Sequence, residues 1–314
     1  MKYAFIERSR HEWPVSIQCY VLDVSVSGFQ QYLHRKATSN TPTAGGGRVN
    51  DMALLAHIRA IHAETKGAYG WPRMWRELHR RNIKVGKERV RKMMKDNEIR
   101  ARGKRKYKAT TDSNHGLPVS ENLLNRNFQP EQPNQVWTGD ITYIHTNEGW
   151  LYLAVVIDLF SRQVVGWALG ERMTRHLVID ALTMAWFRRH PAPGLIFHSD
   201  QGSQYASSDF QTALQRFSMR GSMSRKGNCW DNAVTETLFG SLKVERIHGK
   251  RFETRRQAKD EVIDWLLFYN SKRMHSTLGY VSPMGFEKKW RCQQKALAAY
   301  SGGYGGRCTG ARSL

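Results

Sequence analysis

The stretch WLYLAVVID, residues 150–158, decides the fold of this chain. It is almost continuously apolar, as expected for a β-strand that is covered on both faces. Two further stretches flank it, VWTGDITYI at 136–144 and VVGWAL at 164–169, and both are rich in the β-branched and aromatic residues that favour strands. The connections are short, so we expect the three strands to form an antiparallel meander.

The residues after this meander alternate between helix and strand patterns. Apolar residues at helical spacing predict a helix over about 175–189, followed by a short strand at 195–198. A helix over 208–217, a short strand at 219–223 and a long helix from about residue 231 complete the series. This order predicts an α/β fold with a five-stranded mixed sheet and helices on its faces.

The charge of the chain favours a polyanionic partner. Lys plus Arg total 49 against 27 Asp plus Glu, a formal net charge of +22, and residues 66–108 hold 17 basic residues and four acids. Nucleic acid is the first expectation and an anionic membrane surface the second. Apolar residues in this basic segment predict short helices over about 71–81 and 87–95, which resemble a helix-turn-helix. An ordinary helical hairpin would show the same pattern. From this module we expect DNA contacts by Arg76, Arg80, Lys87, Arg91 and Lys92.

Composition divides the chain into six segments. Residues 37–49 are rich in Thr, Ser and Gly and read as a flexible linker, and residues 104–132 lack periodicity and read as another. We therefore expect an N-terminal helical segment (1–36), a linker (37–49), the basic module (50–103), a linker (104–132), an α/β core followed by helices that close it (133–290) and a flexible tail (291–314).

The sequence argues against a membrane-spanning helix and against a fold held together by disulfide bonds. The apolar run Leu151 to Ile157 has seven residues, whereas a membrane span needs about 20. Cys19, Cys229, Cys292 and Cys308 have neither CxxC spacing nor paired His, which argues against a zinc site or a disulfide framework. We expect an intracellular, cytoplasmic protein with reduced thiols.

Three carboxylates occupy unusual positions. Asp140 lies within the first predicted strand, Asp200 directly follows the fourth, and Glu236 lies inside the long helix. An unpaired anion in a central strand is costly to bury, so a compensating cation is expected. Mg²⁺ suits two or three such carboxylates, and two ions about 4 Å apart can assist phosphodiester chemistry. Asp200 alone could be a strand-end cap. Asp158 ends the second strand near the expected place of Asp140, where we expect it to form a turn, and it is the alternative if one of the three acids is wrongly assigned.

Polar residues near these acids have two readings each. Asn232 and Lys243 share a helix face with Glu236, so Lys243 could hold a DNA phosphate or be a solvated surface lysine. His198 is expected to be a packed strand-end histidine rather than a metal ligand, and His275 either touches phosphate or packs between helices. Trp230 either stacks on a base or packs in the core.

Four motifs, in order, carry a resemblance to a known family. They are WTGDITY (137–143), HSDQGSQY (198–205), SMSRKGNCWDNA (222–233) and Glu236 with the trailing Leu242, Lys243 and Glu245. Between Asp200 and Glu236 stand 35 residues, the interval of the D,D(35)E pattern. The chain resembles the OrfB-type DDE transposases of bacterial insertion sequences, within the retroviral-integrase and ribonuclease-H-like superfamily. Tyr69 to Arg102 also resembles the helical module that precedes the family's core. The segment holding Tyr269, Asn270, Arg273, His275, Leu278 and Pro283 resembles the one that closes it.

The resemblance implies a fold, a chemistry and partners. It implies a ribonuclease-H-like core in which Asp140, Asp200 and Glu236 form a catalytic, metal-binding triad with two Mg²⁺ ions, for which Mn²⁺ can substitute. The implied reaction is cleavage of element ends by water, then attack of the freed 3′-hydroxyl on another phosphodiester. The partners are double-stranded DNA at element ends and target, further copies of the chain in a homodimer or larger assembly, and an upstream OrfA-type protein or fusion, at the bacterial nucleoid. The candidate DNA contacts within the core are Lys243, Asn232, Arg225, Lys226, Arg273 and His275.

Two other functions stay open on the sequence. A ribonuclease-H-like nuclease would cut without joining strands, and an element-derived repressor would bind DNA without chemistry. The presence of all three acids argues against the repressor, whereas only an assay for joined products separates transposase from nuclease.

Overall fold

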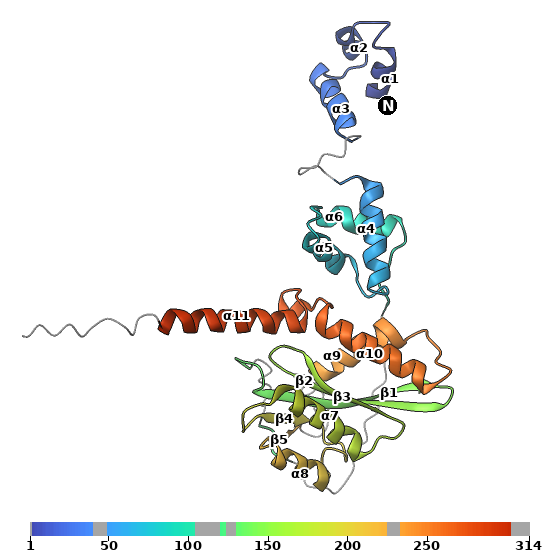
Figure 1. Ribbon diagram of the computed structural model, residues 1–314. Helices are drawn as coiled ribbons and strands as arrows, with labels where there is room; N and C mark the ends of the chain where they lie inside the picture. The colour runs from blue at the N-terminus through green and yellow to red at the C-terminus, as the bar shows by residue number, and fades with distance from the viewer. Residues whose placement is uncertain (1, 40–48, 104–119, 124–129, 225–232, 303–314) are drawn as a thin grey trace, which may run out of the picture. The chain divides into compact units, whose positions relative to one another are not determined.

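The chain forms two compact units, each described here by itself. The computed structural model describes residues 2–39, 49–103, 120–123, 130–224 and 233–302. One unit comprises Met1–Thr65 and Tyr69–Arg100, and the other comprises Lys66–Ala68 and Ala101–Leu314. Helices make up the regular structure described in the first unit, and the second unit contains the sheet (Figure 1).

The sheet has five strands in the order β3-β2-β1-β4-β5. β1 (Val136–Thr146), β2 (Gly149–Asp158) and β3 (Val164–Gly170) form the antiparallel meander that the sequence predicts. β4 (Ile196–Ser199) pairs parallel to β1, and β5 (Arg220–Met223) pairs parallel to β4. The predicted five-stranded mixed sheet is therefore confirmed.

Two helices cover one face of the sheet. They are α7 (Arg175–Arg189) and α8 (Ser208–Arg216), and they pack with Trp137, Val156 and Phe197 in one buried cluster. Gly166 in β3 permits the close approach of α7, since a Cβ at this position would lie 2.2 Å from the Ala181 carbonyl oxygen. The absence of a side chain here therefore sets how closely helix and sheet can pack.

The opposite face is covered by the C-terminal helices, drawn in orange in Figure 1. α9 (Ala233–Leu242) continues into a π-helical segment, η2 (Lys243–Ile247), and α10 (Arg255–Ser271) follows. Trp265 and Leu266 of α10 and Leu238 of α9 pack with Leu151 and Leu153 of β2. A 3-10 turn, η3 (Ser276–Leu278), leads to α11 (Pro283–Gly302). Both faces of the central strands are thus buried, which explains their continuous apolar character.

The first unit contains two sets of three helices. The N-terminal set comprises α1 (Lys2–Ser9), α2 (Val15–Val21) and α3 (Val26–Ser39). The second comprises α4 (Asp51–Glu64), α5 (Trp71–Arg80) and α6 (Lys87–Asp96), and it buries Ile58, Met74, Leu78, Val90 and Met94. Helices α5 and α6 match the helices predicted at about 71–81 and 87–95.

Two helix ends differ from the sequence prediction. α3 continues to Ser39, past the predicted start of the linker at 37, and α11 continues to Gly302, past the predicted start of the tail at 291. Residues 303–314 lie outside the described residues. In the described part of the chain, none of the helices combines the length and apolar character that crossing a membrane requires.

Candidate active site

The parallel pairing of β1 and β4 places two of the predicted acids side by side. Thr138 is the partner of His198 in this register, so Asp140 stands level with Asp200, which follows the last residue of β4. Residues two apart on a strand project from the same face, and adjacent strands lie about 4.8 Å apart. Asp200 is held by its own loop, since its Oδ1 accepts a hydrogen bond of 3.0 Å from the Gly202 N–H.

The third acid belongs to a helix on the same face. Ile144, four residues beyond Asp140 in β1, packs with Leu238 and Leu242 of α9. Asp140 therefore faces the side of the sheet that α9 covers, and Glu236 lies in the first turn of that helix. The sheet register and the packing of α9 together direct Asp140, Asp200 and Glu236 toward one region.

The charges of the other two acids affect the ionisation of Asp140. Burial raises the pKa of the Asp140 carboxyl well above its ordinary value, and the charges of Asp200 and Glu236 raise it further. The Ile141 N–H, which donates to Asp140 Oδ1 at 2.7 Å, and the charge of Lys243 act in the opposite direction. Burial also raises the pKa of Glu236. The site gathers negative charge that a cation would relieve.

The described residues do not form a closed coordination shell. Across 2–39, 49–103, 120–123, 130–224 and 233–302, no three His, Cys, Asp or Glu side chains converge closely enough to hold one ion. The donor chemistry nevertheless fits a hard divalent cation, because all three groups are carboxylates and oxygen ligands are what Mg²⁺ prefers. The raised pKa of Asp140, to which the charges of Asp200 and Glu236 contribute, also favours such a cation.

Lys243 lies close enough to this region to interact with the charge of Asp140. It opens the π-helical segment η2, and burial lowers the pKa of its ammonium group while Tyr143 and Asp140 raise it. Its Nζ lies 5.3 Å from the centroid of the Tyr143 ring. A half-buried lysine beside Asp140 is not a solvated surface lysine, and its contact with a DNA phosphate stays a prediction.

The segment that carries Lys243 is anchored by a buried ion pair. Arg273 donates from Nη2 to Glu245 Oε1 at 2.6 Å and to Ser241 Oγ at 3.1 Å. Trp265 Nε1 donates to Glu245 Oε2 at 2.9 Å. Arg273 is only 4% exposed, so it differs from the expected DNA contact. Its guanidinium neutralises Glu245 inside the protein, a role that an isolated arginine in a sequence does not reveal.

Three other polar residues singled out in the sequence make hydrogen bonds within the protein. A ring nitrogen of the fully buried His198 lies 2.9 Å from Ser222 Oγ, in agreement with the packed reading. Asp158 is also buried and accepts from the N–H groups of Asn134 and Ser161, so it organises a turn instead of joining the acids. His275 is half-buried and its ring lies 2.9 Å from Thr277 Oγ1. Arg225, Lys226, Trp230 and Asn232 lie outside the described residues.

Tyr205 is a residue of this region that the sequence reasoning missed. It is 2% exposed. Its burial, together with the charges of Asp140 and Asp200, raises the pKa of its hydroxyl well above the ordinary value. A Cβ at Gly139 would lie 3.3 Å from Tyr205 Oη and 2.6 Å from the Phe197 ring. Its place five residues after Asp200, within the HSDQGSQY motif, was the available signal.

In the basic module, Trp75 is surrounded by cations. Its Nε1 donates to the Val85 carbonyl oxygen at 2.8 Å, which ties α5 to the turn before α6. The guanidinium carbon of Arg76 and the Nζ of Lys87 lie 4.9 Å and 5.0 Å from the ring centroid. The side chains of the five predicted DNA contacts here, Arg76, Arg80, Lys87, Arg91 and Lys92, are all exposed. Arg80 and Arg91 also pair with Glu77 and Glu88 of their own helices.

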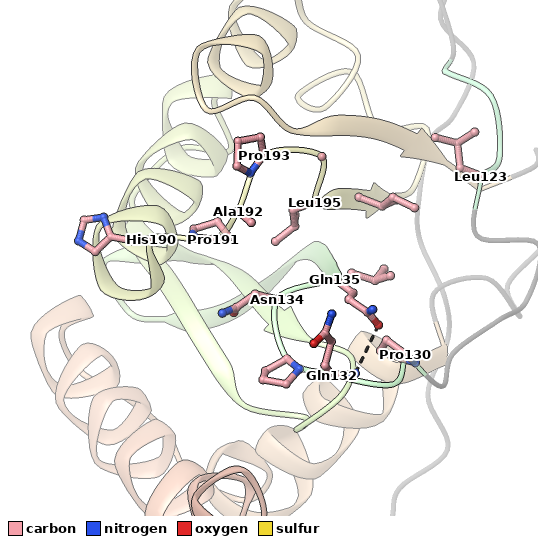
Figure 2. Close-up of a pocket in the computed structure, with 14 residues that line it drawn as sticks. Leu123, Pro130, Gln132, Asn134, Gln135, His190, Pro191, Ala192, Pro193 and Leu195 are labelled. Carbon is pink, nitrogen blue, oxygen red and sulfur yellow. Dashed lines mark hydrogen bonds between the residues drawn. The ribbon is translucent and has the colours of Figure 1, made fainter. Parts of the chain in front are cut away.

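A hollow of about 650 Å³ lies elsewhere in the second unit (Figure 2). Its lining includes residues 132–136, before and at the start of β1, and 190–196, up to the start of β4. In Figure 2, Pro191, Ala192, Pro193 and Leu195 line one side, and Asn134 and Gln132 the other. Asp200 follows the opposite end of β4, so this hollow is distinct from the region of the acids.

Comparison with known proteins agrees with this geometry. Two models described as an integrase core domain match residues 130–229 and 236–290, and a model described as an HTH-like domain matches residues 49–107. Transposase InsF for insertion sequence IS3A of Escherichia coli (strain K12) is 43% identical over 290 residues, covering 92% of this chain and 99% of that protein. The insertion element IS600 uncharacterized 31 kDa protein of Shigella sonnei is 41% identical, covering 87% and 98%.

Solved structures with a similar arrangement include two retroviral ones. The HTLV-2 integrase catalytic core domain in complex with magnesium (trimeric form) has a TM-score of 0.40 at 17% identity, covering 51% of this chain and 99% of that one. The simian T-cell lymphotropic virus intasome in complex with PP2A regulatory subunit B56 gamma has a TM-score of 0.40 at 18% identity, covering 69% and 70%.

The extent of the match to the transposases decides the family. It runs through the helix-turn-helix-like module and the whole integrase core, and it includes the positions of Asp140, Asp200 and Glu236 within the matched domains. The chain belongs to the transposases of bacterial insertion sequences, polynucleotidyl transferases of DNA transposition with an integrase catalytic core.

Proposed function

We propose that this transposase cleaves and joins DNA with Asp140, Asp200 and Glu236 as its catalytic carboxylates. The observation that carries the proposal is the β1–β4 register, which sets Asp140 level with Asp200 on the face covered by α9, the helix of Glu236. The raised pKa of Asp140, to which both other acids contribute, agrees with this geometry. The three carboxylates would hold divalent cations, Mg²⁺ by preference and two in number, with Mn²⁺ as a substitute. Such ions would stabilise charge on the oxygens of a reacting phosphodiester.

The proposed reaction has two balanced steps. Water first displaces the 3′-oxygen at an element end, which leaves a 3′-hydroxyl and a 5′-phosphate. That hydroxyl then attacks a phosphodiester of the target, forms a new bond to phosphorus and expels the target's own 3′-oxygen. Lys243 lies beside the acids and would hold a DNA phosphate against them. The exposed cations of α5 and α6 would supply phosphate contacts that position the duplex.

The partners follow from the same reaction. Double-stranded DNA at the element ends and at the target is the substrate, and two ends are joined at once, so the acting form is a dimer or larger assembly on DNA. An upstream OrfA-type protein, separate or fused, would share end recognition. Because the substrate is chromosomal DNA, the protein would act in the cytoplasm at the nucleoid.

A carboxamide at Asp200 tests the assignment of the acids. The full chain is incubated with Mg²⁺ and DNA that carries the element ends, and joined products are resolved on a sequencing gel. We expect Asp200→Asn to abolish joining while duplex binding persists, because phosphate contacts made elsewhere supply most of the affinity. Asp209→Asn is the matched control, since Asp209 lies on α8 and pairs with Arg175.

The outcomes separate the alternatives. Joined products from the Asp200→Asn protein at the normal rate would show that the acids are wrongly assigned. Cleaved but never joined ends from the unmodified protein would identify a nuclease without strand transfer.

A further inference from the structure

The bundle of α1, α2 and α3 has a small but well-defined core. Ile6, Cys19 and Phe29 are each at most 1% exposed, one from each helix. Gly28 lets α1 approach α3, since a Cβ there would lie 2.3 Å from Tyr3 Oη. Lys36 Nζ of α3 also pairs with Glu7 of α1 at 2.6 Å. The first of the three matched domain models begins at residue 49, so this bundle precedes all of them.

A tight turn joins the second and third helices of this bundle. Asp23 has φ of +49°, in the left-handed region, and the Val24 N–H donates to the Cys19 carbonyl oxygen at 3.0 Å, which ends α2. The Ser25 hydroxyl then accepts from the Gly28 N–H at 3.0 Å and caps the start of α3. Two helices joined by a turn of this length and supported by a third helix form a helix-turn-helix.

The outward face of α3 has the chemistry of base recognition. Val26, Ser27, Gln30, Gln31 and His34 are exposed at helical spacing, while Phe29 on the other side is buried. Gln pairs with adenine through two hydrogen bonds, Ser bonds to several bases, and an apolar side chain contacts the thymine methyl group. The sequence of α3 contains neither Asp nor Glu, so no carboxylate on it would repel phosphate.

Basic side chains of the bundle suit the flanking phosphates. Arg8 and Arg10, at and after the end of α1, are exposed. Residues 2–39 contain five Lys or Arg against three Asp or Glu, and the whole chain carries a net charge of +22. A few phosphate contacts of this kind would position the module, while base contacts would specify the site.

We propose that residues 2–39 form a second DNA-reading module, separate from α4–α6, whose helix α3 enters the major groove of duplex DNA. The proposal goes beyond the catalytic function, because it assigns sequence preference to a part of the chain that the matched domains leave out. It predicts that the full chain recognises two blocks of base pairs, one through each helical module.

The test selects DNA sequences with the full chain in the absence of divalent metal. The protein is incubated with duplexes that contain a long randomised region, and bound sequences are recovered and read. The variant is Gln30→Ala with Gln31→Ala, which removes two base-reading side chains without altering charge and places a good helix former on an exposed face. The matched control is Gln293→Ala with Gln294→Ala, an adjacent exposed pair on α11.

We expect the variant to lose one block of the selected motif and to keep the other. Its affinity for the duplex selected by the unmodified protein, measured by fluorescence anisotropy, should fall about tenfold or more. Its affinity for a scrambled duplex should stay the same, because the phosphate contacts are intact. The control pair should select the full motif.

Three results would overturn the proposal. One is an unchanged motif and affinity, and another is an equal loss on selected and scrambled duplexes. The third is an unchanged motif with an altered oligomeric state, which would assign the bundle to contact between copies through the exposed Ile17, Tyr20 and Val21 of α2. We expect the Asp200→Asn protein to select the same motif. The selection therefore tests the DNA-reading module even if the assignment of the catalytic acids is wrong.

Discussion

Asp140 holds a carboxylate at a position where both neighbouring strands and a helix limit access of water. Burial and the charges of Asp200 and Glu236 disfavour its ionised form, and Lys243 favours it. Burial in turn disfavours the charged form of Lys243, and the charge of Asp140 favours it. Each charge therefore depends on the other, and a substitution at Lys243 acts on the acids as well as on any phosphate it contacts.

Lys243→Gln tests this dependence at the residue scale. Removing a charge-assisted contact to phosphate should lower the rate of strand joining about 10- to 100-fold, corresponding to roughly 1.5–3 kcal/mol. Binding of duplex DNA should change little, since the exposed cations of α5 and α6 remain. Lys243→Arg should retain more activity than Lys243→Gln.

Lys288→Gln is the control for this prediction, because Lys288 is exposed on α11. Single-turnover joining assays at fixed salt give the comparison. Joining by the Lys243→Gln protein at the rate of the control would exclude a role for this lysine in the reaction.

At the scale of elements, the π-helical segment η2 departs from the regular α-helix that precedes it. It carries Lys243 toward the acids, and Glu245, two residues on, is held by Arg273 of the loop after α10. Widened turns of this kind persist where packing or function compensates their poorer geometry. Here the compensation is visible, because Trp265 also donates to Glu245.

Arg273→Met should destabilise the protein by about 3–5 kcal/mol, because the Glu245 carboxylate would stay buried without its partner. Arg273→Met combined with Glu245→Gln should lose less than the sum of the two single changes. Urea unfolding followed by tryptophan fluorescence measures both. Strict additivity, or a loss of DNA affinity at unchanged stability, would return Arg273 to the surface role expected from the sequence.

The sheet and its helices could be predicted because each has a periodic apolar pattern, and β2 with its run at 150–158 is the strongest case. The extension of α11 to Gly302 could not, since residues 291–298 are exposed and show no apolar stripe. Its Gln, Lys, Ala and Leu residues are good helix formers. The prediction gave more weight to the glycines of the tail, which follow residue 301.

Prediction of the site has a similar limit. Asp140, Asp200 and Glu236 stand out by position in the chain, but the register that sets Asp140 level with Asp200 is a long-range pairing that no local pattern encodes. Arg273 looks like a surface cation until its partner Glu245 is found in space. The assignment of the three acids as metal ligands stays a prediction.

On the scale of the whole catalytic unit, Glu287 of α11 joins the C-terminal helix to α7. Its carboxylate pairs with Arg189 at 2.7 Å and with Arg291 at 2.6 Å. Burial alone would raise the pKa of Glu287, but the hydrogen bond and charge of Arg189, with those of Arg291, hold it below the ordinary value of 4.5. Its contribution to stability is therefore present above pH 4.5 and is lost as pH falls through the folded-state pKa.

Glu287→Gln should consequently flatten the acid side of the stability profile. The free energy of unfolding of the unmodified protein should fall as pH drops below 4.5, and that of the variant should fall less. Glu171→Gln, which removes an exposed partner of Arg255, should leave the profile unchanged. Parallel profiles for the Glu287→Gln and unmodified proteins would show that other carboxylates control acid unfolding.

The parallel alignment of β1 with β4 also affects when, during synthesis of the chain, the three acids can come together. Between these strands the ribosome must deliver β2, β3 and α7, and the helix that bears Glu236 emerges later still. Contacts that span so much chain form late in folding. A nascent or truncated polypeptide therefore completes helices α4 to α6 before the region of Asp140, Asp200 and Glu236 can assemble, so the proposed DNA-positioning part is made before the proposed catalytic one.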